Sequence, residues 1–306
     1  NHGPRRCGTE GKQVVMAFTF ANHAGRAVLI SGDSFHDLET LSGGKIPADP
    51  MSALAHEDRL HELQKQTAGR TPEGTVDASQ LGAPSPAPQK VFGIGLNYKT
   101  HADESGMEVP DNPVVFAKFS SCIAAPNTNV ELRSERVDYE AEIVVIIGKG
   151  GKDIEKADAW KHVFGITAGQ DVSDRAVQMA SKPPHFDLGK SFDTFGPIGP
   201  VVVSPDALPN RDAIGLKCLV NGEERQNDST ANLIFDIPFL IEYLSHITTL
   251  KTGDVIFTGT PAGVGMMQKK LLRDGDVVTT IVDGVGTLTN KCVRVADHEL
   301  PLKKRG

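Results

Sequence analysis

Two glutamates, Glu140 and Glu142, stand two residues apart in the segment DYEAEIVVII at 138–147, which is typical of a β-strand. Side chains two apart in a strand point to the same face, so the two carboxylates are expected about 7 Å apart. Two adjacent anions entering an apolar strand are costly unless a cation lies between them. A hard divalent cation with oxygen ligands meets that need. A solvated strand end is the alternative interpretation of the pair.

A third carboxylate, Asp171, follows the strand-like stretch 163–167 within a turn signal, in the sequence AGQDVS. Three carboxylates without cysteine or histidine nearby in sequence suit Mg²⁺ or Mn²⁺ better than Zn²⁺. The pattern therefore predicts a metal site of Glu140, Glu142 and Asp171, provided that the fold brings the three together.

His101 and Glu104 form a second candidate pair, in the sequence NYKTHADE. A spacing of three places both side chains on one face of a helical turn. A carboxylate beside an imidazole raises its basicity and fixes its tautomer, which a general base requires. A surface ion pair is the alternative interpretation.

Lys190 lies among apolar and turn residues in GKSFDTFGP, where it either stays exposed or meets an anion in a site. The segment GTPAGVG at 259–265 follows a strand and can present backbone N–H groups and the Thr260 hydroxyl to an oxyanion or carboxylate. It differs from a P-loop because no Gly-Lys-Ser/Thr follows it. Both segments are candidates for binding an anionic substrate.

The composition limits the classes of protein that need to be considered. The chain has 306 residues, of which 39% are hydrophobic and 23% charged, as in ordinary globular proteins. A net charge of −7 argues against nucleic-acid binding. The apolar runs are too short to span a bilayer. The 4 cysteines are far apart, which argues against a disulfide scaffold and favours a reducing cytoplasm.

The elements that must position these residues fall into two units joined by a proline-rich stretch. Mixed strands without regular βαβ alternation argue against a Rossmann sheet or a TIM barrel. Strands are expected at 18–20, 27–30, 91–94, 138–147, 254–258, 277–282 and 285–288. Helices are expected at 50–67, 154–164 and 238–247. The predicted organisation is a disordered leader or tag (1–15), a small N-terminal domain (16–80), a linker (81–90), a catalytic domain (91–296) and a C-terminal tail (297–306).

Six segments in this order resemble the fumarylacetoacetate hydrolase family. They are GIGLNYKTHADE (93–104), VDYEAEIVVIIGK (137–149), GQDVSDRAVQ (169–178), LGKSFDTFGPIGP (188–200), LKTGDVIFTGTPAGVG (250–265) and DGVGTLTN (283–290). The resemblance implies a mixed α/β, mainly β chain. Its catalytic domain is expected to be a β-sandwich roll beside a small N-terminal α+β domain, usually in a homodimer.

The resemblance also implies a role for individual residues. Mg²⁺ or Mn²⁺, with Ca²⁺ as a possible substitute in crystals, is expected on Glu140, Glu142 and Asp171. Catalysis is assigned to His101, Glu104 and Lys190, and substrate binding to Gln178, Thr260 and Gly259. The founding enzyme has a further aspartate ligand upstream of its histidine. The corresponding segment, 92–96, holds no acid here, so the chain is more similar to the three-carboxylate branch.

The function that follows is metal-dependent hydrolysis of a C–C bond in a 1,3-diketo acid, such as an acylpyruvate, a fumarylacetoacetate-like compound or a diketo-sugar acid. His101 and Glu104 would activate the water, and they are expected to be dispensable for enolisation alone. The alternatives are an oxaloacetate-type decarboxylase or a 2-hydroxymuconate-type isomerase at the same metal site, and then a non-catalytic metal-stabilised binding protein. The expected partners are a small anionic keto acid and a second copy of the chain, without nucleic acid or membrane.

Overall fold

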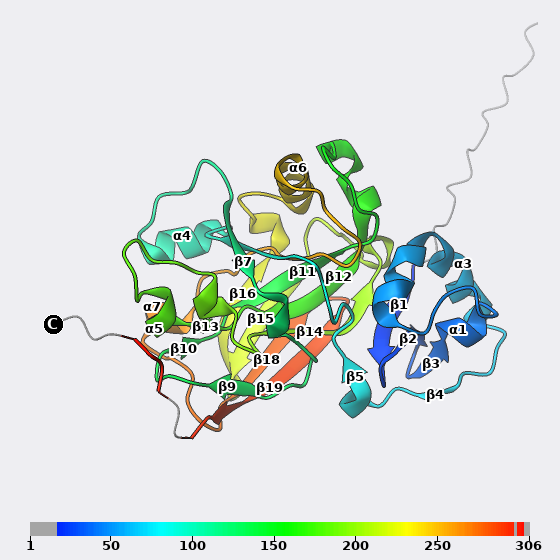
Figure 1. The fold of residues 1–306 in the computed structure, drawn as a ribbon, viewed down its shortest axis with the longest axis horizontal. Helices are drawn as coiled ribbons and strands as arrows, with labels where there is room; N and C mark the ends of the chain where they lie inside the picture. The colour runs from blue at the N-terminus through cyan, green and yellow to red at the C-terminus, as the bar shows by residue number, and fades with distance from the viewer. Residues whose placement is uncertain (1–16, 297–298, 303–306) are drawn as a thin grey trace, which may run out of the picture.

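The structure, a computed structural model, describes residues 17–296 and 299–302. The predicted leader, 1–15, lies outside the described residues, and the predicted tail, 297–306, is described only at 299–302. Figure 1 shows a small N-terminal unit, in blue, beside a larger strand-rich body.

Two sheets form the body, and the first of them extends into the N-terminal unit. In the described residues, the first sheet has 12 strands in the order β4 (Gly74–Thr75), β3 (Ser34–Asp37), β2 (Arg26–Ser31), β1 (Thr19–His23), β14 (Gly196–Val203), β12 (Val163–Gln170), β11 (Ala141–Ile147), β17 (Val255–Phe257), β6 (Val91–Gly95) and β7 (Val114–Lys118), with β5 (Leu81–Gly82) on β1 and β8 (Ile123–Ala124) on β14. The second sheet has the order β16 (Glu223–Ser229), β15 (Gly215–Val220), β18 (Val277–Val282), β19 (Gly286–Arg294) and β9 (Val130–Leu132). A separate pair joins β10 (Val137–Asp138) to β13 (Ser173–Asp174).

Short helices surround these sheets. They are α1 (Leu38–Leu41), α2 (Pro50–Ala53), α3 (Glu57–Thr67), α4 (Lys99–Ser105), α5 (Arg175–Gln178), α6 (Ile237–Ile247) and α7 (Gly265–Gln268). None of the helices among the described residues is long and apolar enough to cross a membrane.

Strand β11 is the centre of the fold, between β12 and β17, and all of its residues are buried. Ile143, Val145 and Ile147 point into the core between the two sheets, whereas Val144 and Ile146 join the cluster shared with the N-terminal unit. Burial on both faces explains why this run lacks the usual alternation of apolar and polar residues. The predicted class, mixed α/β and mainly β, is confirmed.

The prediction of a helix at 154–164 is wrong. Residues Lys156–His162 form a 3₁₀ helix, and β12 starts at Val163. Strand pairing with β11 and β14 on either side outweighs the local helical composition at the end of this segment.

Other predicted elements exist with changed limits. The helix expected at 50–67 is divided into α2, a 3₁₀ turn and α3. The strand expected at 138–147 is interrupted at Tyr139 and Glu140, where the chain passes from β10 to β11. Helix α6 is confirmed with its predicted cap, because the Asp236 side chain accepts a hydrogen bond from the Phe239 N–H.

The N-terminal unit continues the first sheet of the body. Strand β1 pairs antiparallel with β14, with Phe20 opposite Val202. The proline-rich stretch 81–90 runs along the body, where β5 pairs with β1 and the Ser85 hydroxyl donates to the Gly253 carbonyl.

Candidate metal centre and active site

The carboxylates of Glu140, Glu142 and Asp171 converge at one point, and one oxygen from each lies within 4.8 Å of the other two. Glu140 directly precedes β11, Glu142 lies in β11, and Asp171 follows β12. The adjacent strands bring the two ends together, and the Asp171 backbone N–H donates to the Glu140 carbonyl at 2.8 Å. All three side chains are buried.

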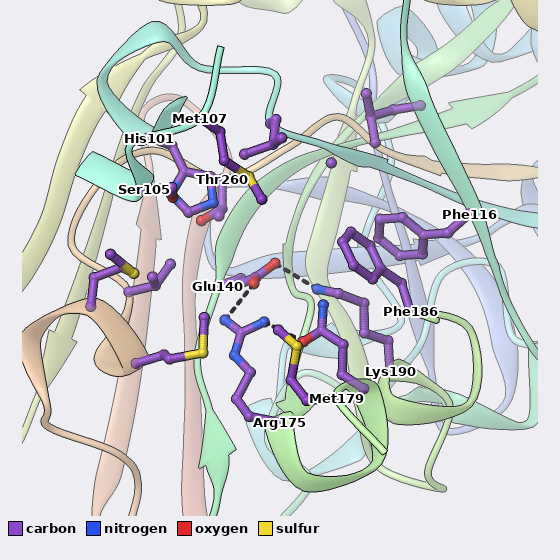
Figure 2. Close-up of a pocket in the computed structure, with 17 residues that line it drawn as sticks. His101, Ser105, Met107, Phe116, Glu140, Arg175, Met179, Phe186, Lys190 and Thr260 are labelled. Atoms are coloured by element: carbon purple, nitrogen blue, oxygen red, sulfur yellow. Dashed lines mark hydrogen bonds and ion pairs between the residues drawn. The ribbon is translucent and has the colours of Figure 1, made fainter. Parts of the chain in front are cut away.

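Two cations hold Glu140 from opposite sides. Arg175 Nη2 donates to Glu140 Oε1 at 2.7 Å, and Lys190 Nζ donates to Glu140 Oε2 at 2.7 Å. Figure 2 shows these two contacts at the centre of the pocket. Burial by itself raises the pKa of Glu140, but the attraction of Lys190 and Arg175 outweighs it and lowers the pKa. Glu140 is therefore ionised at neutral pH.

Lys190 is buried and uses all of its donors. Its ammonium group donates to Glu140 Oε2 and, at 2.8 Å each, to Asp171 Oδ2 and Ser173 Oγ. Burial opposes its charge, yet Asp171 and Glu140 raise its pKa above the ordinary value. The sequence left two alternatives for Lys190, an exposed side chain or contact with an anion. The structure shows contact with the carboxylates of Glu140 and Asp171.

A second lysine, Lys118, lies on the other side of Asp171 at the end of β7. Its Nζ donates to Asp171 Oδ1 at 2.7 Å, to the Phe195 carbonyl at 3.2 Å and to the Lys190 carbonyl. The side chain is fully buried. Lys118 therefore fixes the orientation of the Asp171 carboxylate.

The charges in this network favour a bound cation. Asp138 also accepts from Arg175, at 2.8 and 3.0 Å, so four carboxylates face the side-chain cations Lys118, Arg175 and Lys190. Glu142, the fourth carboxylate, accepts a hydrogen bond from the Gly259 N–H but forms no ion pair within the described residues. Burial and the negative charges of Asp171 and Glu140 raise the pKa of Glu142 well above its ordinary value. Hard oxygen donors with excess negative charge fit Mg²⁺ or Mn²⁺.

His101 projects from α4 into the same pocket, and its side chain is 13% exposed. The ring Nδ1 is buried without a hydrogen-bond partner and lies 3.9 Å from Glu104 Oε2. Burial lowers the pKa of His101 below its ordinary value. The structure therefore places the His101 imidazole in the same pocket as the Glu140 carboxylate (Figure 2), and burial favours the neutral form of the ring.

Glu104 connects α4 to the 259–265 loop. Its Oε2 accepts a hydrogen bond from the Gly263 N–H at 2.9 Å. The distance to His101 is too long for a hydrogen bond, so Glu104 here acts on His101 through charge and through the position of α4.

The predicted substrate-binding residues have different environments. Gln178 lines the pocket, and its Oε1 accepts from Arg175 Nη1 at 2.8 Å. Thr260 also lines the pocket, but its hydroxyl donates to the Ala141 carbonyl at 2.8 Å. The Gly259 N–H donates to Glu142 Oε2 at 2.7 Å, so in this structure Gly259 contacts the metal-site carboxylate.

The pocket has about 170 Å³ of internal space, between α4, α5 and the 259–265 loop. Its inner part is polar and holds His101, Glu140, Arg175 and Lys190. The outer part is apolar, and four methionines contribute to it: Met107, Met179, Met266 and Met267.

Reasoning from the sequence missed Arg175, Asp138 and Lys118. Lys118 and Arg175 are charged residues without a diagnostic spacing, whereas Asp138 lies two residues before Glu140 and continues the alternation of Glu140 and Glu142. Arg175 does directly follow the predicted ligand segment, and its position in DVSDRAVQ could have been taken as a signal.

Residues 90–293 match the family model for the fumarylacetoacetate (FAA) hydrolase C-terminal domain. The chain therefore belongs to the fumarylacetoacetate hydrolase family and is an enzyme of that family.

Among the relatives, the oxaloacetate tautomerase YisK of Bacillus subtilis is 39% identical over 267 residues, which are 83% of this chain and 88% of YisK. The mitochondrial oxaloacetate tautomerase fahd2 of Xenopus laevis is 39% identical over 241 residues, 74% of this chain and 76% of that protein. Among solved structures, the maleylpyruvate hydrolase of Sphingobium sp. SYK-6, in complex with manganese(II) and pyruvate, superposes with a TM-score of 0.75 at 28% identity, covering 90% of this chain and 99% of that chain. The manganese in that neighbour and the buried triad here support a divalent-metal site.

These relatives correct the predicted activity. The sequence predicted C–C bond hydrolysis, but relatives at 39% identity over most of the chain are oxaloacetate tautomerases. The predicted alternative, isomerisation or decarboxylation at the same metal site, agrees better with them. The six segments could not make this distinction, because hydrolysis and isomerisation both need an activated keto acid and therefore the same carboxylates.

Proposed function

We propose that the protein is a metal-dependent oxaloacetate tautomerase, which interconverts the enol and keto forms of oxaloacetate. The observation that carries the proposal is the buried carboxylate triad with a neutral, unpartnered imidazole in the same pocket. The names of the relatives at 39% identity support this choice among the activities that such a site can have.

The metal would be held by Glu140, Glu142 and Asp171. When bound, a divalent cation withdraws electron density from the ketone oxygen of the substrate and makes the C3 protons more acidic. The residues around the triad then have to bind the acid and move one proton between carbon and oxygen.

We assign to His101 the removal and the return of the proton at C3 of the substrate. Its Nδ1 is buried beside Glu104, so the other ring nitrogen, Nε2, is the atom that would accept the proton from the substrate and later return it. Glu104, 3.9 Å away, stabilises the imidazolium that forms. This replaces the activation of water, which tautomerisation does not require.

Arg175 and Gln178 would bind a carboxylate of the substrate. Four of the five guanidinium N–H groups donate to Asp138, Glu140 and Gln178, which fixes the plane of the group and leaves one N–H. The Gln178 amide lies beside it in the pocket. Lys190 supplies positive charge next to Glu140, where negative charge develops on the enolate.

The test follows the conversion of enol to keto oxaloacetate by the loss of enol absorbance, with the protein and Mg²⁺ or Mn²⁺. The expected result is an accelerated, metal-dependent conversion without release of CO₂. Release of CO₂ at the same rate would favour the decarboxylase, and no effect on either reaction would exclude the proposal.

Several predictions from the sequence stay predictions. These are the choice between Mg²⁺ and Mn²⁺, the homodimer and the absence of nucleic-acid and membrane partners. A cytoplasmic location is also a prediction, and some relatives are named as mitochondrial proteins.

A further inference from the structure

The outer part of the pocket is unusually rich in methionine. The chain has 6 methionines, and four of them line this one pocket: Met107, Met179, Met266 and Met267. Met107 is 56% exposed, Met179 43% and Met267 37%. Figure 2 shows Met107 and Met179 on different sides of the central Glu140. Unbranched thioether side chains adapt their shape to apolar ligands of different outlines.

Aromatic rings complete this apolar wall. Phe116 and Phe186 lie edge to face with their centroids 5.5 Å apart, and both line the pocket (Figure 2). We call the five residues Met107, Met179, Phe186, Met266 and Met267 the mouth of the pocket.

The mouth offers no partner for a second negative charge. Among the residues that line the pocket, the only lysine and arginine are Lys190 and Arg175. Lys190 donates to Glu140, Asp171 and Ser173, and Arg175 keeps one N–H. A carboxylate that extends into the mouth would meet no cation, whereas an apolar group there would be stabilised by contact with the methionine and phenylalanine side chains.

We propose that the site also accepts 2-oxo acids with an apolar group on C3, such as phenylpyruvate, and interconverts their keto and enol forms. This inference rests on the proposed tautomerase function and extends its substrate class. The 2-oxo acid end would bind at the polar inner part, and the aryl group would lie among the methionines.

The reaction is balanced without any co-reactant. In the enol direction the C3–H bond breaks, the proton moves to His101, and the electron pair forms the C2=C3 double bond. The π electron pair of the C2 carbonyl moves to its oxygen, which takes the proton from the His101 imidazolium, and the reverse sequence restores the ketone.

Binding can be measured separately from activity with two acids that cannot enolise. Oxamate carries only the 2-oxo acid part, and oxanilate adds a phenyl ring at the position that corresponds to C3. In calorimetric titrations of the Mn²⁺-loaded protein, we expect oxanilate to bind at least about tenfold more tightly than oxamate, because burial of a phenyl ring favours binding. Equal affinities would overturn the inference.

Variants locate the effect at the mouth. Met179→Asp, with Met267→Asp as a second variant, is expected to reduce the preference for oxanilate at least about threefold, because a short carboxylate side chain removes the apolar surface against which the ring is buried. Ile247→Asp is the matched control, since Ile247 is an exposed apolar residue, 66% accessible, outside the pocket. An equal effect of all three variants would also overturn the inference.

The two proposals fail in different ways. Conversion of oxaloacetate but not of phenylpyruvate, without a preference for oxanilate, would overturn the wider substrate class alone. A preference for oxanilate without keto–enol conversion of either acid would overturn the tautomerase function and leave the apolar binding site.

Discussion

The two halves of the pocket differ in how firmly their side chains are held. In the inner half, Glu140, Arg175 and Lys190 are buried and joined by hydrogen bonds of 2.7–2.8 Å. In the mouth, Met107 and Met179 are largely exposed. The difference indicates that the inner half fixes the chemistry, while the mouth can change with little effect on the metal site and so determine which acid is accepted.

The largest effect is expected from Glu142→Ala. Loss of one of three carboxylate ligands should abolish metal binding and activity while the protein stays folded, as judged by its circular dichroism. Metal affinity is measured by calorimetry, with Glu62→Ala, at an exposed position on α3, as the control. Normal metal affinity in Glu142→Ala would show that the triad is not the metal site.

The next effect concerns proton transfer. His101→Ala should slow the ketonisation of oxaloacetate by about 10²–10⁴-fold, the usual contribution of a general acid–base group. Metal affinity should stay unchanged, because His101 is not assigned as a ligand. The exposed His246→Ala is the control. Full activity of His101→Ala would instead support the expectation from the sequence, that metal coordination alone is enough for enolisation.

Lys118→Met tests whether the ion pair of Lys118 with Asp171 positions this carboxylate for the metal. The substitution removes the charge that orients Asp171, and metal affinity should fall by about 10–100-fold, as for other groups that position a ligand. Lys161→Met, at a position 76% exposed, should have no effect. Because a buried cation is lost, thermal unfolding is measured as well, and a large loss of stability at unchanged metal affinity would assign Lys118 a structural role only.

The pH dependence follows from the imidazole. Burial lowers the pKa of His101, so the neutral form that accepts a proton persists at neutral pH and below. The rate should fall only as the pH passes below the ordinary value of about 6.5, approaching tenfold per unit at lower pH. The measurement is a profile of kcat/KM at saturating metal, compared with His101→Ala, which should lack this limb. A limb centred above 6.5 would contradict the assignment.

The smallest effect is expected at the mouth. Met267→Ala should leave metal affinity unchanged and alter oxaloacetate turnover by less than about threefold, since an exposed methionine contributes little to the packing of the inner half. A loss of metal affinity in this variant would remove the distinction between the two halves.

The metal triad could be predicted from the sequence because its signal is local. Glu140 and Glu142 are two residues apart in a strand, and Asp171 follows a strand that turned out to be the neighbour of β11. Lys118 could not be found in this way, because it reaches Asp171 only through the positions of β7 and the 190–195 segment.

The sequence did not predict the mouth of the pocket, and it predicted a helix at 154–164 that the structure does not contain. The four methionines come from three separate segments, since Met266 and Met267 are adjacent in α7, and only the folded chain brings these segments together. At 154–164, local composition favoured a helix, but pairing with two neighbouring strands made Val163 the start of β12. The type of reaction also could not be predicted, because the same set of carboxylates serves several reactions of keto acids.

The pairing of β1 with β14 has a consequence for the shortest form of the enzyme. The family domain begins near residue 90, but the edge of β14 is covered by β1, and Phe18 and Phe20 pack in one cluster with Val144 and Phe164. A chain cut at residue 90 would leave an open strand edge and a bare apolar face, which favours association between molecules. The N-terminal unit therefore protects the molecule from aggregation as well as completing its sheet.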